Sequence, residues 1–304
     1  MAADTPPRGA SAPPAYPEPL IVEPLQDHRQ TFIILHGRGS FAVKFAPPLL
    51  EMVASSGDSL QSAFPNAKLI FPTASLTRAT IYKRSYTHQW FNNWHLEDHT
   101  KRQDMMVDGL RASCIYIHSL LRKEIEVVGI KNVALWGLSQ GCATSLTSLL
   151  TWDGEPFAAT VGMCGWLPFS NVIKDIAADE GPEDDDPFAH SGDEDEDLFS
   201  GSKNSEAGSR NLGVAYLREE LEMKTEKPGE AFSNVPVFLA HGTEDERVSI
   251  DLGREAKACL DLVGAEVLMS EYEGLGHWYS EDMLRDIFQF LKEKLGPGEA
   301  EVEA

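Results

Sequence analysis

The chain has 304 residues, of which 42% are hydrophobic, and this is enough for one globular domain with a buried core. The formal net charge of −22 comes from 48 acidic and 26 basic residues, and no cluster of Lys and Arg offers the basic face that a nucleic-acid partner would need. No apolar run has the length of a membrane span and the N-terminus lacks a secretory signal pattern, so we expect no stable membrane insertion and a cytoplasmic location.

The first third of the chain predicts a disordered end followed by strands and one helix. Residues 1–19 are rich in Pro and Ala, a composition that buries too little apolar surface to order itself. The apolar periodicity then predicts, in order, strands over 20–26 and 31–37, a helix within 47–64, a strand over 67–74 and an aromatic, polar loop over 75–100. The strand TFIILHG is apolar throughout, which is typical of a strand buried on both faces.

Beyond residue 100, strands and helices alternate. The pattern predicts a helix over 104–129, a strand over 132–139, a helix over 140–150, strands over 157–166 and 236–245, a helix over 251–264, a strand over 266–274 and a helix over 280–295. Strands separated by helices pair in parallel and carry helices on both faces. We therefore expect an α/β fold with a doubly wound, mostly parallel sheet in one domain over 20–296, followed by a flexible tail over 297–304.

An acidic insertion interrupts this alternation. Residues 179–197 hold eleven acidic side chains and no Lys or Arg, which is half of the net charge. We expect a partly disordered insertion over about 175–211. Residues 212–223 predict a helix that would act as a lid over a binding site.

The cysteines and histidines give little support for a metal site. Cys114, Cys142, Cys164 and Cys259 are widely spaced, no C-x-x-C occurs, and we interpret all four as reduced thiols. His88, His95, His99 and Asp98 are the alternative metal ligands, and His95 and His99 have helical spacing. Because these four residues lie in an aromatic loop, we expect no bound metal.

Ser139 is the candidate nucleophile. It stands in LWGLSQG, a G-x-S-x-G motif at the end of the strand over 132–139. Gly137 and Gly141 lack the side chains that would collide where a strand turns abruptly into a helix. The same motif also occurs by chance at the ends of ordinary strands, so a base and an orienting acid are required as well.

Asp245 and His277 are the candidate acid and base. Asp245 follows the strand over 236–245, and His277 follows the strand over 266–274. The chain order Ser, Asp, His is that of an α/β-hydrolase, with each residue after a separate strand. Glu244 competes with Asp245 for the orienting role at this stage, and either residue could be an ordinary loop acid.

An ester hydrolase also needs N–H donors for the oxyanion. Gln140 supplies the first by its position after Ser139, and the loop HGRGS supplies the second, with Arg38 as the donor residue. We expect His36 to hold this loop by hydrogen bonding. Leu76, Trp166, Leu167 and Trp278 are candidate acyl-binding residues, although ordinary core packing would explain them equally well.

Together these segments resemble a known family. LHGRGS, FPTA, QWFNNW, ALWGLSQGCATSL, CGWLP, LAHGTEDERV and GLGHWYSEDMLRDIFQFL resemble the acyl-protein thioesterase and carboxylesterase branch of the α/β-hydrolases over about residues 32–295. The resemblance implies Ser139 as nucleophile, His277 as base, Asp245 as orienting acid, and N–H donors at Arg38 and Gln140. It also implies hydrolysis of acyl esters or thioesters without a cofactor.

The chain departs from the family pattern at three places. Ser40 stands where H-G-x-G-D has an aspartate, and Arg38 replaces a small or apolar residue beside the oxyanion. That arginine either favours a polar or anionic substrate or points to solvent. The third departure is the insertion, which would alter access to the site or recruit a partner.

Two functions therefore remain open. The first is a serine hydrolase that forms an acyl-enzyme and acts on esters or thioesters, for which a lipidated protein is a candidate substrate. The second is a catalytically weak adaptor of the same fold whose acidic insertion binds a partner. A homodimer is a further expectation.

Overall fold

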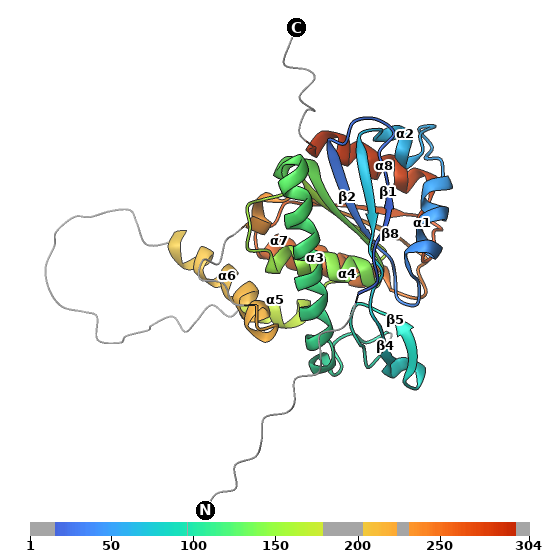
Figure 1. Cartoon of the computed structure of the whole chain (residues 1–304). Helices are drawn as coiled ribbons and strands as arrows, with labels where there is room; N and C mark the ends of the chain where they lie inside the picture. Colours follow the sequence, from blue (N-terminus) through green and yellow to red (C-terminus); the bar gives the residue numbers. More distant parts are fainter. Residues whose placement is uncertain (1–15, 96, 179–202, 224–230, 296–304) are drawn as a thin grey trace, which may run out of the picture.

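The structure is a computed structural model and describes residues 16–95, 97–178, 203–223 and 231–295 (Figure 1). A seven-stranded sheet forms its centre, in the order β1-β3-β2-β6-β7-β8-β9. Its strands are β1 (Leu20–Val22), β2 (Gln30–Leu35), β3 (Ala67–Phe71), β6 (Val133–Leu138), β7 (Ala159–Met163), β8 (Val237–Gly242) and β9 (Val267–Tyr272). Only β1 pairs antiparallel in this sheet, so the expected doubly wound, mostly parallel architecture is confirmed.

Helices cover both faces of the sheet (Figure 1). They are α1 (Ala42–Glu51), α2 (Leu60–Ala63), α3 (Val107–Val128), α4 (Gln140–Thr151), α5 (Ser170–Ala178), α6 (Lys203–Glu220), α7 (Ile250–Leu262) and α8 (Glu281–Lys294). Short 3-10 turns span Thr80–Tyr82, Gln103–Met105, Ile130–Asn132 and Ala231–Asn234. A search of the described residues finds no helix with the length and apolar character needed to cross a membrane.

Two hydrophobic cores form because successive side chains of a strand point to opposite faces. In β2, Ile33 and Leu35 belong to a core shared with α3, α4, α5, α6 and α7. Phe32 and Ile34, which alternate with them, belong to the core shared with α1, α2 and α8. All four side chains are fully buried, which explains the uninterrupted apolar run in the sequence.

The fold differs from expectation at the insertion, where both flanks are helical. Helix α5 extends to Ala178, and α6 begins at Lys203, nine residues before the helix expected over 212–223. Leu217 belongs to the same core as Ile173 of α5, and a Cβ atom added at Gly213 would lie 2.8 Å from the Ile173 carbonyl oxygen. Disorder was expected over 1–19, in the acidic run and over 297–304. The acidic run and residues 297–304 lie outside the described residues, as does all of 1–19 except 16–19.

The segment expected to be a loop over 75–100 contains a small antiparallel pair. Strands β4 (Leu76–Ala79) and β5 (Ser85–His88) pair with each other and not with the main sheet. The turn between them needs left-handed backbone at Lys83 and Arg84, with φ of 51° and 65°. Neither residue is a Gly, so the usual sequence signal of such a turn is missing.

The four cysteines are buried and free. Burial raises the pKa of the Cys114 thiol to about 11 and that of Cys164 and Cys259 to about 12, and it raises the pKa of Cys142 further. The thiols therefore remain protonated and behave as small apolar side chains.

Candidate active site

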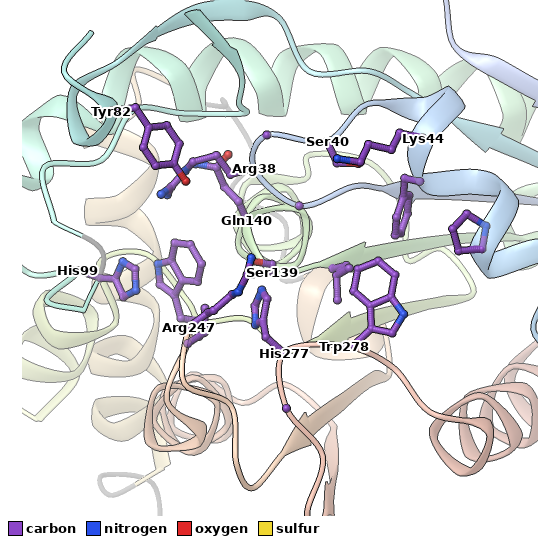
Figure 2. Close-up of a pocket in the computed structure, with 18 residues that line it drawn as sticks. Arg38, Ser40, Lys44, Tyr82, His99, Ser139, Gln140, Arg247, His277 and Trp278 are labelled. Atoms are coloured by element: carbon purple, nitrogen blue, oxygen red, sulfur yellow. The ribbon is translucent and has the colours of Figure 1, made fainter. Parts of the chain in front are cut away.

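A cleft of about 620 Å³ lies at the carboxyl ends of the parallel strands, and eighteen residues line it (Figure 2). The loops after β2, β6, β8 and β9 all contribute to its walls. Ser139, His277, Arg38 and Gln140, which are distant in the sequence, all line it. The carboxyl ends of parallel strands meet at one edge, where such sheets form their ligand crevices.

Ser139 occupies a strained turn between β6 and α4. Its backbone has φ of 58° and ψ of −118°, a combination that residues other than glycine rarely adopt. Its backbone N–H donates to the Met163 carbonyl oxygen at 2.8 Å. A Cβ atom at Gly137 would lie 2.3 Å from the carbonyl group of Gly141, and one at Gly141 would lie 2.5 Å from the Leu35 carbonyl oxygen. Both glycines are therefore required by close backbone packing.

Asp245 and His277 form a buried hydrogen-bonded pair. His277 Nδ1 lies 2.7 Å from Asp245 Oδ2, and the other carboxylate oxygen accepts the N–H groups of Arg247 and Val248 at 2.9 Å. Burial of the Asp245 carboxyl opposes its ionisation, but these bonds and one with His241 outweigh it, so the pKa of Asp245 lies well below its ordinary value.

Glu244 is exposed, whereas the Asp245 side chain is fully buried beside the imidazole. The structure thus distinguishes the two acids that the sequence left open.

The bond to Asp245 fixes the tautomer of His277. An ionised carboxylate can only accept, so Nδ1 of the imidazole carries the proton and donates it to Asp245. In the neutral form of the same ring, Nε2 is then the unprotonated nitrogen and can accept a proton from a group in the cleft. Ser139 and His277 both line this cleft, and Figure 2 shows them next to each other in projection.

The loop after β2 lies directly over Ser139. A Cβ atom added at Gly37 would lie 3.3 Å from Ser139 Cβ and 3.8 Å from its Oγ, so the absence of a side chain leaves room beside the hydroxyl. Gln140 begins α4, where the first N–H groups of a helix have no partner within the helix. The Gln140 side chain bonds the backbone of Trp90 and Phe91 and thereby ties the loop over 89–93 to the base of the cleft.

His36 holds the loop after β2 in place, as the sequence predicted. Its Nε2 accepts the N–H of Ala74 at 3.0 Å, so Nδ1 carries the proton and donates to the Gly37 carbonyl oxygen at 2.7 Å. The indole N–H of Trp90 donates to the His36 carbonyl oxygen. His36 is fully buried and contributes no atom to the cleft wall.

Acidification from pH 7 to pH 5 is expected to destabilise the fold through three buried histidines. Burial lowers the pKa of His36, His99 and His118 to about 4, whereas a histidine in the unfolded chain titrates near 6.5. Between these values the unfolded chain binds more protons than the folded chain, so the free energy of unfolding falls as pH falls, by about 2 kcal/mol per histidine at pH 5.

Urea denaturation at pH 7 and pH 5, followed by circular dichroism, measures this loss. The variant His118→Asn lacks one of the three groups and should lose less stability over the same interval. An unfolding free energy that does not change between the two pH values would contradict the expectation.

Comparison with known proteins identifies the family. A family model described as Phospholipase/Carboxylesterase matches residues 17–181 and 213–295, which is well over half of the chain. The chain belongs to the phospholipase/carboxylesterase family. The matched ranges leave out residues 182–212, between α5 and the part of α6 that packs on the core.

Named relatives and a solved structure agree with this family. The chain is 24% identical to acyl-protein thioesterase 1 of Candida albicans over 265 residues, covering 86% of this chain and 90% of the relative. It is 23% identical to carboxylesterase SOBER1 of Arabidopsis thaliana over 271 residues, covering 88% and 91%. The crystal structure of Zea mays acyl-protein thioesterase 2 shares the fold with a TM-score of 0.65 at 21% identity, covering 92% of this chain and all of that one. The chain is therefore a hydrolase of the esterase and thioesterase class.

Two of the four expected acyl-binding residues do not line the cleft of this family member. Trp166 and Trp278 line it, but Leu76 and Leu167 do not. Leu76 pairs with His88 in the small β4–β5 sheet and has 54% of its side chain exposed, while Leu167 is buried in the core. The sequence could not separate these cases because all four residues are large, apolar and close to strand ends.

The four residues considered as alternative metal ligands each make a different contact in the structure. His88 bonds the Ala74 carbonyl oxygen, His95 accepts two backbone N–H groups, Asp98 bonds Thr100, and the His99 ring stacks on Trp166 with centroids 4.1 Å apart. Among the described residues, ligand atoms from three different side chains come within 4.8 Å of one another at Cys164, Asp245 and His277.

The structure adds residues to the cleft that the sequence did not single out. They include Lys44 and Phe45 of α1, Tyr82, and Arg247. Arg247 follows Asp245 by two positions, and Lys44 lies in the first turn of α1, four residues after Ser40. Proximity in sequence to a predicted site residue was the available signal for both cations.

Helix α6 lies away from this cleft. Arg218 of α6 donates to the carbonyl oxygens of Leu150 and Trp152 at the end of α4, and none of the described side chains over 212–223 lines the cleft. The described conformation therefore leaves the cleft without the lid expected from residues 212–223.

Proposed function

We propose that this chain hydrolyses acyl esters or thioesters through Ser139 as nucleophile, His277 as general base and Asp245 as the acid that orients the base. The observation that carries the proposal is the position of Ser139 on a strained strand-to-helix turn in the same cleft as His277, whose Nδ1 is bonded to buried Asp245. Serine is a weak nucleophile on its own and requires a base held in a fixed tautomer.

In the first half of the reaction, Ser139 Oγ attacks the acyl carbon while His277 Nε2 takes the hydroxyl proton. The carbonyl oxygen becomes an oxyanion, for which the backbone N–H groups of Arg38 and Gln140 are the proposed donors. The protonated imidazole is stabilised by ionised Asp245 and then gives its proton to the departing alcohol or thiol. An acyl group remains bonded to Ser139.

In the second half, His277 removes a proton from water, and the resulting nucleophile attacks the acyl-enzyme. The tetrahedral oxyanion uses the same donors. When it collapses, the proton returns from His277 to Ser139 Oγ and the carboxylic acid leaves. The cycle restores the enzyme and needs no cofactor.

The apolar wall of the cleft supports an acyl substrate. Trp278, which is 42% exposed, lines the same cleft as Phe45 and Pro48 of α1 and offers a surface for an alkyl chain. We include S-acylated proteins among the substrates because relatives carry the name acyl-protein thioesterase. A cytoplasmic location forms part of the proposal, since four buried free cysteines are typical of a reducing compartment.

Labelling by a fluorophosphonate probe tests the nucleophile. The wild-type protein should gain one probe mass, located by peptide mass spectrometry at Ser139, and Ser139→Ala should gain none. Ser40→Ala is the matched control, because it removes another serine hydroxyl from the wall of the same cleft and should leave labelling in place. Absence of labelling in the wild-type protein would favour the adaptor function instead.

A further inference from the structure

The cleft has two chemically different ends. Figure 2 shows Arg38, Tyr82, His99 and Arg247 on one side of Ser139 and Lys44 and Trp278 on the other. Lys44 on the Trp278 side belongs to α1, the helix that also supplies Phe45 and Pro48 to the cleft wall. The opposite end, which we call the cationic end, is formed by Arg38, Arg247, Tyr82, His99 and Trp166.

Arg38 brings a positive charge to the cationic end without a carboxylate partner. Its side chain does not point to solvent: Nη2 donates to Asn93 Oδ1 at 2.6 Å, and Tyr82 also accepts a hydrogen bond from it. Both partners are neutral oxygen atoms. Burial lowers the pKa of Arg38, which shows that the surrounding protein compensates its charge poorly.

At the cationic end, several buried N–H donors have no acceptor among the described residues. Asn93 Oδ1 accepts hydrogen bonds from Arg38 and from Gln140 Nε2, which fixes the orientation of the Asn93 amide. Asn93 Nδ2 is therefore the donor to His99 Nδ1, at 3.4 Å. Since His99 Nδ1 accepts this bond, the ring proton of His99 is on Nε2. Within the part of the chain that the structure describes, His99 Nε2, Trp166 Nε1 and Arg38 Nε have no hydrogen-bond partner. These three N–H groups are buried and unpaired, so they add positive partial charge to the protein around the cationic end.

Arg247 adds a second charge at the rim. Its backbone N–H serves Asp245, but its side chain forms no ion pair with any described residue, and Figure 2 shows it extending toward Ser139. Among the residues that the structure describes, none that lines the cleft is Asp or Glu, although the whole chain has 48 acidic residues and 26 basic ones. Positive charge thus collects beside Ser139 in a chain that is strongly acidic elsewhere.

We propose that the cationic end selects esters or thioesters that carry an anionic oxygen group, a carboxylate or a phosphate, close to the scissile bond. This inference rests on the proposed function and names its substrate class. A guanidinium group is planar and presents paired donors that match the oxygens of either anion. The alkyl part of the substrate would occupy the opposite end, against Trp278.

Matched ester pairs test this selectivity on either side of the scissile bond. For the acyl side, the p-nitrophenyl esters of adipic acid and of its neutral monoamide are compared. For the alcohol side, 4-carboxyphenyl and 4-carbamoylphenyl butyrate are compared. We expect wild-type kcat/KM to favour the anionic member of at least one pair by about tenfold, the range of one charge-assisted interaction. Equal kcat/KM within both pairs would overturn the proposal.

Arg247 variants then locate the effect. Arg247→Gln keeps the backbone N–H that bonds Asp245 and removes the charge, so the anionic preference should fall to about twofold, and Arg247→Glu should abolish it. Lys123→Gln removes the same charge from the exposed surface of α3, outside the cleft, and should keep the full preference. An undiminished preference in Arg247→Glu would contradict the assignment to this end of the cleft.

A binding measurement separates this proposal from the proposed function. Calorimetric titration of Ser139→Ala with benzoate, phenyl phosphate and benzamide requires no catalysis. Tighter binding of either anion than of benzamide supports the proposal and distinguishes carboxylate from phosphate, while equal or weaker binding of both anions refutes it. If the wild type hydrolyses no ester, the proposed function fails, and this titration still decides whether the cationic end binds anions.

Discussion

Asp245→Asn is expected to lower kcat/KM for a short p-nitrophenyl ester by about 10³- to 10⁴-fold. Asn can still accept the N–H groups of Arg247 and Val248 through its amide oxygen, so the loop after β8 keeps its bonds. The atom facing His277 Nδ1 would become an amide nitrogen, which donates and therefore favours the tautomer with the proton on Nε2. That imidazole cannot accept the proton of Ser139. Steady-state kinetics, with circular dichroism to verify folding, measures the effect.

Glu244→Gln is the matched control for this prediction. It makes the same change from acid to amide at the adjacent position, where the side chain is exposed and does not contact His277. Its kcat/KM should stay within about twofold of the wild type, as is usual for surface substitutions. A large loss in Glu244→Gln with full activity in Asp245→Asn would reverse the assignment of the orienting acid.

Gly137→Ala is expected to destabilise the protein by more than about 3 kcal/mol or to prevent folding, because its methyl group would overlap backbone that has no alternative position. The added Cβ would lie 2.3 Å from both the carbonyl carbon and oxygen of Gly141, well inside van der Waals contact. Relief would require α4 to shift, and all twelve residues of α4 are buried. Urea denaturation of the purified variant, or its soluble yield, measures the loss.

Gly276→Ala provides the control for this second prediction. The nearest described atom to its Cβ would be the Glu244 carbonyl oxygen at 3.9 Å, an ordinary contact, so the free energy of unfolding should change by less than about 1 kcal/mol. Comparable losses in the two variants would mean that the close packing at the turn is not what makes Gly137 necessary.

The parts of the fold that the sequence predicted well are those encoded by local pattern. The buried strands β2, β6 and β8 are largely apolar runs, and each is followed within three residues by a polar residue that the sequence singled out, His36, Ser139 and Asp245 respectively. The sequence could therefore place Ser139 and the pair Glu244 and Asp245 near one edge of the sheet, because strands of one parallel sheet end there together. The choice between Asp245 and Glu244 required the distance to His277, which no local pattern contains.

The features that the sequence did not predict depend on tertiary contact. The β4–β5 pair turns at Lys83 and Arg84 without the glycine that usually marks left-handed backbone. Helix α5 owes its apolar face to packing against α6 and α7, across a segment whose composition suggested disorder. Arg247 and Lys44 are common surface residue types, and only the arrangement of the loops shows that they border one cleft.

The parallel pairing of β7 with β8 has a consequence for the order in which the molecule is made. Everything that precedes the insertion, including Ser139 and the loop after β2, leaves the ribosome before β8 and β9 exist. Asp245 and His277 arrive with those last two strands, and long-range parallel pairing is slow to form. Under the proposed mechanism, a nascent chain would carry Ser139 without its base until the last two strands dock, so only completed chains would hydrolyse substrate.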